Sequence, residues 1–101
     1  MTEQHDIVRR ILSDGEWHIV GELAQAVYPL ISPEVAVRAV TNAWKGFDPA
    51  LLGSRSMREK LWYGRRLVLA NILLRLGVEH DGPRQGMSHL VRLKKAPIST
   101  G

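Results

Sequence analysis

One long helical segment constrains this 101-residue chain more than any other feature of its sequence. Ser56 and Glu59 have the spacing of a capping box, in which two side chains satisfy free backbone N–H groups at the start of a helix. Gly77 is the first residue after them that suits a helix stop, so we expect a helix from Ser56 to Leu76. Twenty residues of helix span about 30 Å. Gly64 lies inside the segment and weakens a helix by roughly 1 kcal/mol relative to Ala, so a break there is the alternative.

Three shorter helices are predicted before this segment, each from apolar residues at helical spacing and from residues that start or stop a helix. They cover residues 2–12, 20–27 and 33 to about 45. Gly15 suits the left-handed conformation after the first helix, and Pro29 ends the second. Ser32 and Pro33 are an N-cap and a first-turn proline for the third.

The sequence pattern changes from helix to strand after Gly77. Residues 78–80 and 89–93 have the composition of strands, and turn-forming residues lie between them. We therefore predict a β-hairpin with Arg84 at its tip. Residues 17–19 add one extended segment, long enough for a single short strand.

The chain has the length of one domain. We assign residues 1–93 to this domain, with a loop over residues 47–55, and residues 94–101 to a flexible basic tail. The expected fold class is mainly α with a small β-hairpin, that is α+β.

Composition excludes several classes of function. The chain has no cysteine, which excludes disulfides, zinc–thiolate sites, iron–sulfur clusters and cysteine nucleophiles. This suits a reducing compartment, and we expect a cytoplasmic protein without a signal peptide, because residues 1–6 are polar and no apolar run follows. The most apolar stretch, residues 67–78, is too short to span a bilayer. No phosphate-binding glycine loop, nucleophile elbow or paired-carboxylate spacing is present, so we expect neither an enzyme nor a small-molecule substrate.

The histidines offer one weak metal candidate. His80 and His89 can face each other across the hairpin beside Asp81, but metal sites usually need three or four ligands, so we expect no metal or cofactor. The three tryptophans are expected to pack in the core or between helices, since each lies beside an apolar stripe. They are Trp17, Trp44 and Trp62.

Charge is distributed unevenly along the chain. The whole chain carries +4, but residues 1–37 carry −4 and residues 38–101 carry +8. Positive charge is densest between Arg55 and Arg66, where Glu59 is the only acidic residue. A basic surface of this kind favours binding to a polyanion, and the alternative is a solvated surface or ion pairing within the protein.

The long helix is apolar on two sides. Arg58 and Arg65 fall in the middle of the broader apolar face. We therefore expect that the helix begins near Gly64, that these arginines extend beyond the core, or that they pair with a carboxylate. The opposite side carries a second stripe, which consists of Tyr63, Leu67, Ala70 and Leu74. Either the helix over residues 33–45 covers this stripe, or the stripe is a partner face.

Two segments of the chain carry a resemblance to a known family. They are GEWHIVGELA at residues 15–24, and residues 65–93, where a helix ending in LLRLGVE passes into a hairpin that closes on LVRL. Over residues 4–93 the order of elements resembles the winged-helix variant of the helix-turn-helix domain, in particular the small winged-helix proteins of actinobacteria and their phages. The chain has one helix more than the simplest winged helix, so the recognition helix is either residues 33–45 or residues 56–76.

The resemblance implies a duplex DNA-binding module that acts without chemistry, as a transcription regulator or a phage accessory factor. The helix before the wing would enter the major groove and the wing would contact the adjacent backbone. The residues expected to bind DNA are Arg55, Arg58, Lys60, Tyr63, Arg65, Arg66, Arg84, Lys94 and Lys95. Two alternatives stay open. One is a winged-helix interaction module that forms a homodimer or binds a host protein through the second stripe, and the other is RNA binding through the same basic surface.

Overall fold

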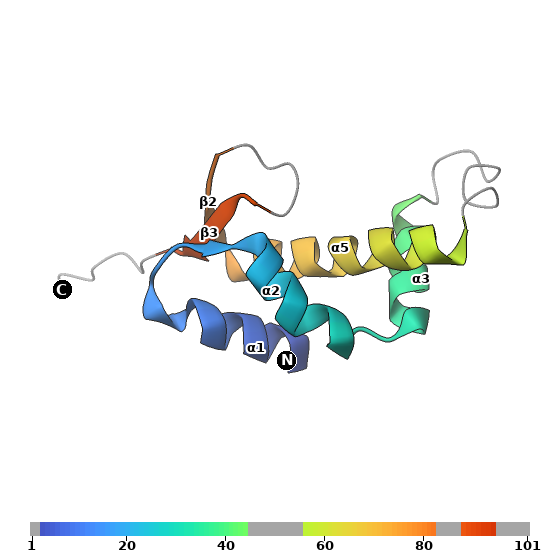
Figure 1. The fold of residues 1–101 in the computed structure, drawn as a ribbon, viewed down its shortest axis with the longest axis horizontal. Helices are drawn as coiled ribbons and strands as arrows, with labels where there is room; N and C mark the ends of the chain where they lie inside the picture. Colours follow the sequence, from blue (N-terminus) through green and yellow to red (C-terminus); the bar gives the residue numbers. More distant parts are fainter. Residues whose placement is uncertain (1–2, 45–55, 83–87, 95–101) are drawn as a thin grey trace.

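The computed structural model of the chain describes residues 3–44, 56–82 and 88–94. It is mainly helical with a small antiparallel sheet, which confirms the predicted fold class (Figure 1). The described elements are α1 (Glu3–Ile11), the 3₁₀ turn η1 (Leu12–Asp14), β1 (His18–Ile19), α2 (Val20–Val27), the 3₁₀ turn η2 (Tyr28–Leu30), α3 (Pro33–Ala43), α5 (Met57–Leu76), β2 (Val78–Asp81) and β3 (Leu90–Leu93). The predicted loop at 47–55, the hairpin tip and the tail after Lys94 lie outside the described residues.

Helix α5 has the two ends that its sequence predicts. At its start, the Ser56 hydroxyl oxygen accepts a hydrogen bond from the Glu59 backbone N–H at 3.1 Å. At its end, Gly77 adopts φ 68°, and its N–H points to the carbonyl oxygens of Leu73 and Leu74 at 3.1 and 3.2 Å. Both caps satisfy backbone groups that a helix end leaves without partners.

Helix α5 continues through Gly64 without a break. The glycine serves a tertiary contact with α3 instead. It is buried against Ala36 of α3. Figure 1 shows α3 crossing the N-terminal part of α5. A Cβ at this position would lie 2.0 Å from the carbonyl oxygen of Ala36 and 2.8 Å from its Cα. Only a residue without a side chain allows the two helices to approach this closely.

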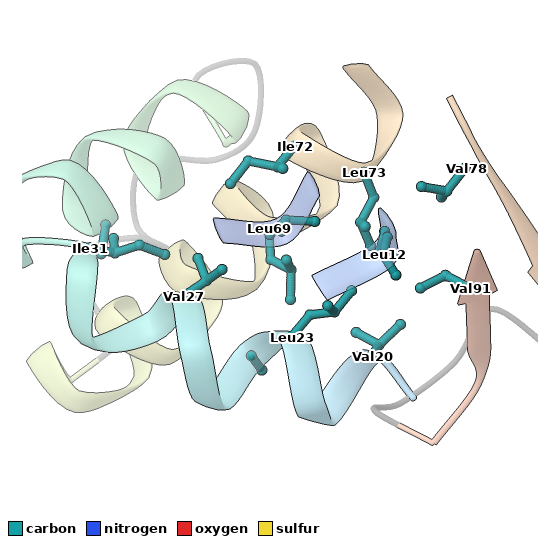
Figure 2. Close-up of a cluster of buried hydrophobic side chains, with 13 residues drawn as sticks. Leu12, Val20, Leu23, Val27, Ile31, Leu69, Ile72, Leu73, Val78 and Val91 are labelled. Atoms are coloured by element: carbon teal, nitrogen blue, oxygen red, sulfur yellow. The ribbon is translucent and has the colours of Figure 1, made fainter. Parts of the chain in front are cut away.

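The main core lies between the C-terminal half of α5 and the elements formed by the N-terminal part of the chain (Figure 2). Leu12, Leu23 and Val27 are fully buried there. They pack with Leu69 of α5 and Val91 of β3. Burying a side chain of this size stabilises a fold by roughly 1.5–3 kcal/mol. The N-terminal half of α5 extends beyond this layer.

The three strands form one antiparallel sheet in the order β1-β3-β2. His18 of β1 pairs with Val91, and Val78 of β2 pairs with Leu93, so β3 is central. The short extended segment predicted at 17–19 is therefore an edge strand of the sheet that contains the hairpin. None of the helices in the described residues combines the length and apolarity that a membrane span requires.

Candidate nucleic-acid interface

The N-terminal half of α5 carries most of the described residues that were predicted to bind DNA. We call Arg58, Lys60, Arg65 and Arg66 the α5 basic surface. Arg58 is exposed and the other three are half-buried. Beside them lies a surface pocket of about 530 Å³, and its lining includes Trp62, Arg58 and Arg65.

The arginines of the α5 basic surface form no ion pair within the described part of the chain. His18 and Arg92, by contrast, do pair with carboxylates of described residues. Two of the three arrangements expected for Arg58 and Arg65 are therefore wrong for the described residues, since α5 begins before Gly64 and neither arginine meets a carboxylate. Instead, Arg58 extends into solvent, while the Arg65 Nε is buried and has no hydrogen-bond partner among residues 3–44, 56–82 and 88–94. No carboxylate among residues 3–44, 56–82 and 88–94 neutralises the charge of either arginine.

Aromatic rings adjoin the α5 basic surface. Tyr63 contacts Trp62 with ring centroids 4.7 Å apart and Trp44 at 5.4 Å, so Trp44 packs between α3 and α5 as predicted. The Arg66 guanidinium lies 4.8 Å from the centroid of the Trp62 ring. The prediction of a core or interhelix position is wrong for Trp62, which keeps 47% of its surface exposed. Leu61 packs against the core from this half of α5, whereas Trp62 does not, and its ring lies against Arg66 and Tyr63.

Trp17 has a charged neighbour as well. The Arg92 guanidinium lies 4.4 Å from the centroid of its ring, and the Arg92 Nε donates to the Glu79 carboxylate at 2.6 Å. Arg92 of the central strand thereby connects Trp17 to β2. Glu79 therefore compensates the charge of Arg92, in contrast to the arginines of the α5 basic surface.

Tyr28 of η2 lies close to two arginines of the α5 basic surface. Burial raises the pKa of Tyr28, although the positive charges of Arg66 and Arg65 act in the opposite direction. Its hydroxyl is buried and has no hydrogen-bond partner among the residues described. Sequence reasoning missed Tyr28, because its position beside α5 arises from the turn between α2 and α3.

The remaining predicted DNA contacts are not gathered at the α5 basic surface. Lys94 is exposed and follows β3 directly, and its neighbour Leu93 pairs with Val78 at the C-terminal end of α5. Lys94 is therefore separated from Arg58 by about the length of α5, roughly 30 Å. Three further predicted contacts lie outside the described residues. They are Arg55, Arg84 and Lys95.

Helix α3 covers the second stripe of α5 only in part. Trp44 packs on Tyr63, and Leu67 is half-buried, but Ala70 is exposed and Leu74 keeps 77% of its surface exposed. All four stripe residues line one groove of about 580 Å³ between α2, α5 and the hairpin, which we call the α5 groove. Its other lining residues are Val20, Tyr28, Arg66, Leu69, Leu73, His80 and His89.

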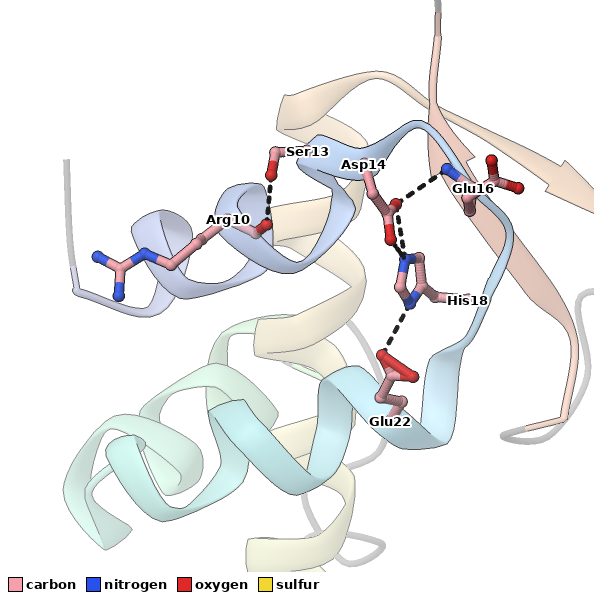
Figure 3. Close-up of polar contacts among 6 residues, drawn as sticks. All are labelled: Arg10, Ser13, Asp14, Glu16, His18 and Glu22. Atoms are coloured by element: carbon pink, nitrogen blue, oxygen red, sulfur yellow. Dashed lines mark hydrogen bonds and ion pairs between the residues drawn. The ribbon is translucent and has the colours of Figure 1, made fainter.

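His18 is bound by two carboxylates in an arrangement that sequence reasoning missed (Figure 3). Its Nε2 lies 2.9 Å from the Asp14 carboxylate, and its Nδ1 lies 2.7 Å from Glu22. The hydrogen bond to Asp14 raises the pKa of His18, with a smaller contribution from Glu22. The hydrogen bond from His18 lowers the pKa of Asp14, as does the one from the Glu16 backbone N–H. The spacing of four residues gave no signal, because Asp14, His18 and Glu22 lie in three different elements rather than in one helix.

The two hairpin histidines do approach each other. The rings of His80 and His89 stack with centroids 5.5 Å apart. Within the described ranges, however, no three histidine or acidic side chains come together in a way that could hold a metal ion.

Comparison with known proteins identifies no relative. No family model matches the chain, and neither a curated protein nor a solved structure matches it significantly. The function is therefore inferred from the geometry and charge of the chain itself.

Proposed function

We propose that this chain is a non-enzymatic, duplex DNA-binding module of the winged-helix type, acting as a transcription regulator or a phage accessory factor. The observation that carries the proposal is the α5 basic surface, whose arginines meet no carboxylate within the described residues. A cluster of uncompensated arginines attracts phosphates, and a bidentate arginine can also read the edge of guanine. The topology supports it, since β1 pairs with the last strand of a hairpin that follows a helix directly.

We propose α5, rather than α3, as the helix that contacts DNA. The N-terminal half of α5 carries four basic residues of the α5 basic surface against Glu59, whereas α3 carries Arg38 against Glu34. Recognition helices contact bases mainly through their N-terminal residues. The β2–β3 hairpin follows α5 after one residue, and it would contact the adjacent backbone as the wing.

The test is a fluorescence anisotropy titration of the full chain against random-sequence duplex DNA at two salt concentrations. Arg58→Gln with Arg66→Gln removes two charges from the α5 basic surface. Arg9→Gln with Arg10→Gln removes two charges from exposed positions of α1 and is the matched control. We expect the first pair to weaken binding at least tenfold and to lower the salt slope by about 2, and the control to change neither.

Other outcomes would point to another function or another helix. No binding at low salt, or equal losses in both double variants, would contradict the proposal. A loss of binding with Arg38→Gln and none with Arg66→Gln would move the interface to α3. Tighter binding to duplex RNA than to duplex DNA in a competition at fixed salt would favour RNA as the ligand.

A second candidate function is a protein-interaction module that uses the exposed end of the second stripe. The observation in its favour is the 77% exposure of Leu74, which is large for a leucine within a helix. Homodimers or complexes with a host protein would bury this side chain. Sedimentation velocity over a range of concentrations tests the homodimer, and Leu74→Lys should abolish any dimer that forms through this face.

A further inference from the structure

We infer that the α5 groove binds a small organic anion that has an apolar body, such as a carboxylic acid with an aliphatic chain. This inference goes beyond DNA binding and does not depend on it. The sequence shows only the second stripe of α5, because the other walls of the groove come from α2, η2, β2 and His89 just before β3.

The size and the floor of the groove suit an apolar body. Its volume of about 580 Å³ falls in the range of small-molecule sites, which is roughly 300–1,000 Å³. The floor consists of side chains that also belong to the core, including Leu69 and Leu73. Ala70 and Leu74 are exposed at the rim. An apolar ligand placed along Ala70 and Leu74 would remove these surfaces from water, which is the main source of affinity in such sites.

The polar groups of the groove select an anion. No acidic side chain lines it, whereas Arg66, His80 and His89 do. Arg66 forms no ion pair with any described residue. The Tyr28 hydroxyl is a donor at the same wall, buried and without an acceptor in the described part of the chain. A carboxylate can accept hydrogen bonds from both Arg66 and Tyr28, and bonds between charged partners are the stronger ones.

The order of groups along α5 sets the orientation of the ligand. Arg66 precedes Ala70 and Leu74 by one and two helical turns, so the apolar part of the wall extends about 12 Å from the arginine. The carboxylate therefore binds at the Arg66 end, and the apolar body runs along α5 toward the hairpin. A second copy of this chain that docks by the same face is a poorer occupant, since it would bring its own Arg66 toward this one.

Isothermal titration calorimetry of the full chain without DNA tests the site with three probes of equal chain length. These are octanoate, 1-octanol and octylamine, which have eight carbons each and carry an anionic, a neutral and a cationic head group. We expect octanoate to bind at least tenfold more tightly than either of the others, as expected for a charge-assisted interaction. Arg66→Gln and Tyr28→Phe should weaken octanoate binding and leave 1-octanol binding unchanged.

Two further variants separate the site from nonspecific adsorption. Ala70→Trp fills the groove from an exposed position and should abolish octanoate binding. Asn71→Trp places the same side chain at an exposed neighbouring position outside the groove and should not. Thermal unfolding followed by circular dichroism checks that both variants are folded. If Ala70→Trp does not fold, Arg66→Gln serves as the test of the site.

Three results would overturn the inference. The first is equal affinity for the three probes, which would indicate adsorption to an apolar surface. The second is octanoate binding that survives both Ala70→Trp and Arg66→Gln. The third is absence of octanoate binding together with a dimer that Leu74→Lys dissociates, which would assign the groove to a second copy. Because no DNA is present, each of these results leaves the proposed DNA binding untouched.

Discussion

Gly64 of α5 lies so close to Ala36 of α3 that an added Cβ would be 2.0 Å from the Ala36 carbonyl oxygen. The obstacle is backbone, so no change of rotamer can relieve it. Gly64→Ala gains about 1 kcal/mol of helix propensity but forces α3 and α5 apart, and overpacking of this kind typically costs 1–3 kcal/mol or more. We expect a net loss of about 1–2 kcal/mol in the free energy of unfolding, measured by urea denaturation.

Two companion variants identify the cause of that loss. Ala36→Gly should not restore stability to Gly64→Ala, because the clash is with the carbonyl group and not with the methyl group. Asn71→Ala, at an exposed position of the same helix, should be neutral or slightly stabilising. A Gly64→Ala protein that is more stable than the parent would show that the two helices do not pack this closely in solution.

His18 predicts a specific dependence of stability on pH. Because its pKa is raised in the folded chain, its contribution is complete below about 6.5, the ordinary value for histidine, and is lost as pH rises through the higher folded value. The lowered pKa of Asp14 has the opposite sign, so its contribution is present above about 3.9 and is lost as pH falls below that value. We therefore expect both contributions to the free energy of unfolding to be complete between about pH 3.9 and pH 6.5.

The pH prediction is checked by urea midpoints between pH 5 and pH 9 for the parent and for His18→Gln. The parent should lose stability on the alkaline side of pH 6.5, and the variant should lose less. Comparing the two slopes separates His18 from the other three histidines of the chain, which titrate in both proteins. Parallel slopes would mean that the carboxylates do not hold His18 in its charged form.

The N-caps of the two helices that cross are expected to contribute similar amounts to stability. The Ser32 hydroxyl oxygen accepts from the Val35 N–H at 3.2 Å, and that of Ser56 accepts from the Glu59 N–H at 3.1 Å. Ser32→Ala and Ser56→Ala should each cost about 1 kcal/mol, and Gly at either position only a few tenths, as measured by thermal unfolding. A loss below about 0.3 kcal/mol for Ser56→Ala would indicate that α5 starts later in solution.

Arg66 belongs to both proposed sites, and this links them. If DNA and an organic anion both bind as proposed, saturating octanoate should weaken duplex DNA binding several-fold, while octylamine should not. The measurement is the same anisotropy titration, repeated with each probe at constant ionic strength. Octanoate that binds without any change in DNA affinity would show that DNA binding does not use Arg66.

The sequence predicted the elements whose signals are local. The capping residue Ser56 and the stop residue Gly77 are read within one helical turn, so both ends of α5 are where they were expected. The strands β2 and β3 and the short strand β1 are also predicted correctly. A change from helical to extended pattern is visible within a few residues. The concentration of positive charge on the first half of α5 likewise needs only the sequence.

Features that depend on crossing elements could not be predicted in this way. The role of Gly64 follows from the approach of α3, and that approach leaves no mark in the sequence around the glycine. The helical spacing places Trp62 on the same apolar face as Leu61, but Leu61 packs against the core while Trp62 stays exposed. His18 acquires its two carboxylates through the turn between α1 and β1 and the start of α2.

The position of β3 in the sheet has a consequence for the order in which the chain folds. This strand is the last described element in the sequence, yet it lies between the other two strands and pairs with His18 and Ile19 near the opposite end of the chain. On the ribosome, β1 and β2 emerge without a hydrogen-bonding neighbour and have to wait for residues 90–93. The helices can form earlier, because their backbone hydrogen bonds are local, so we expect sheet closure to be a late step of folding.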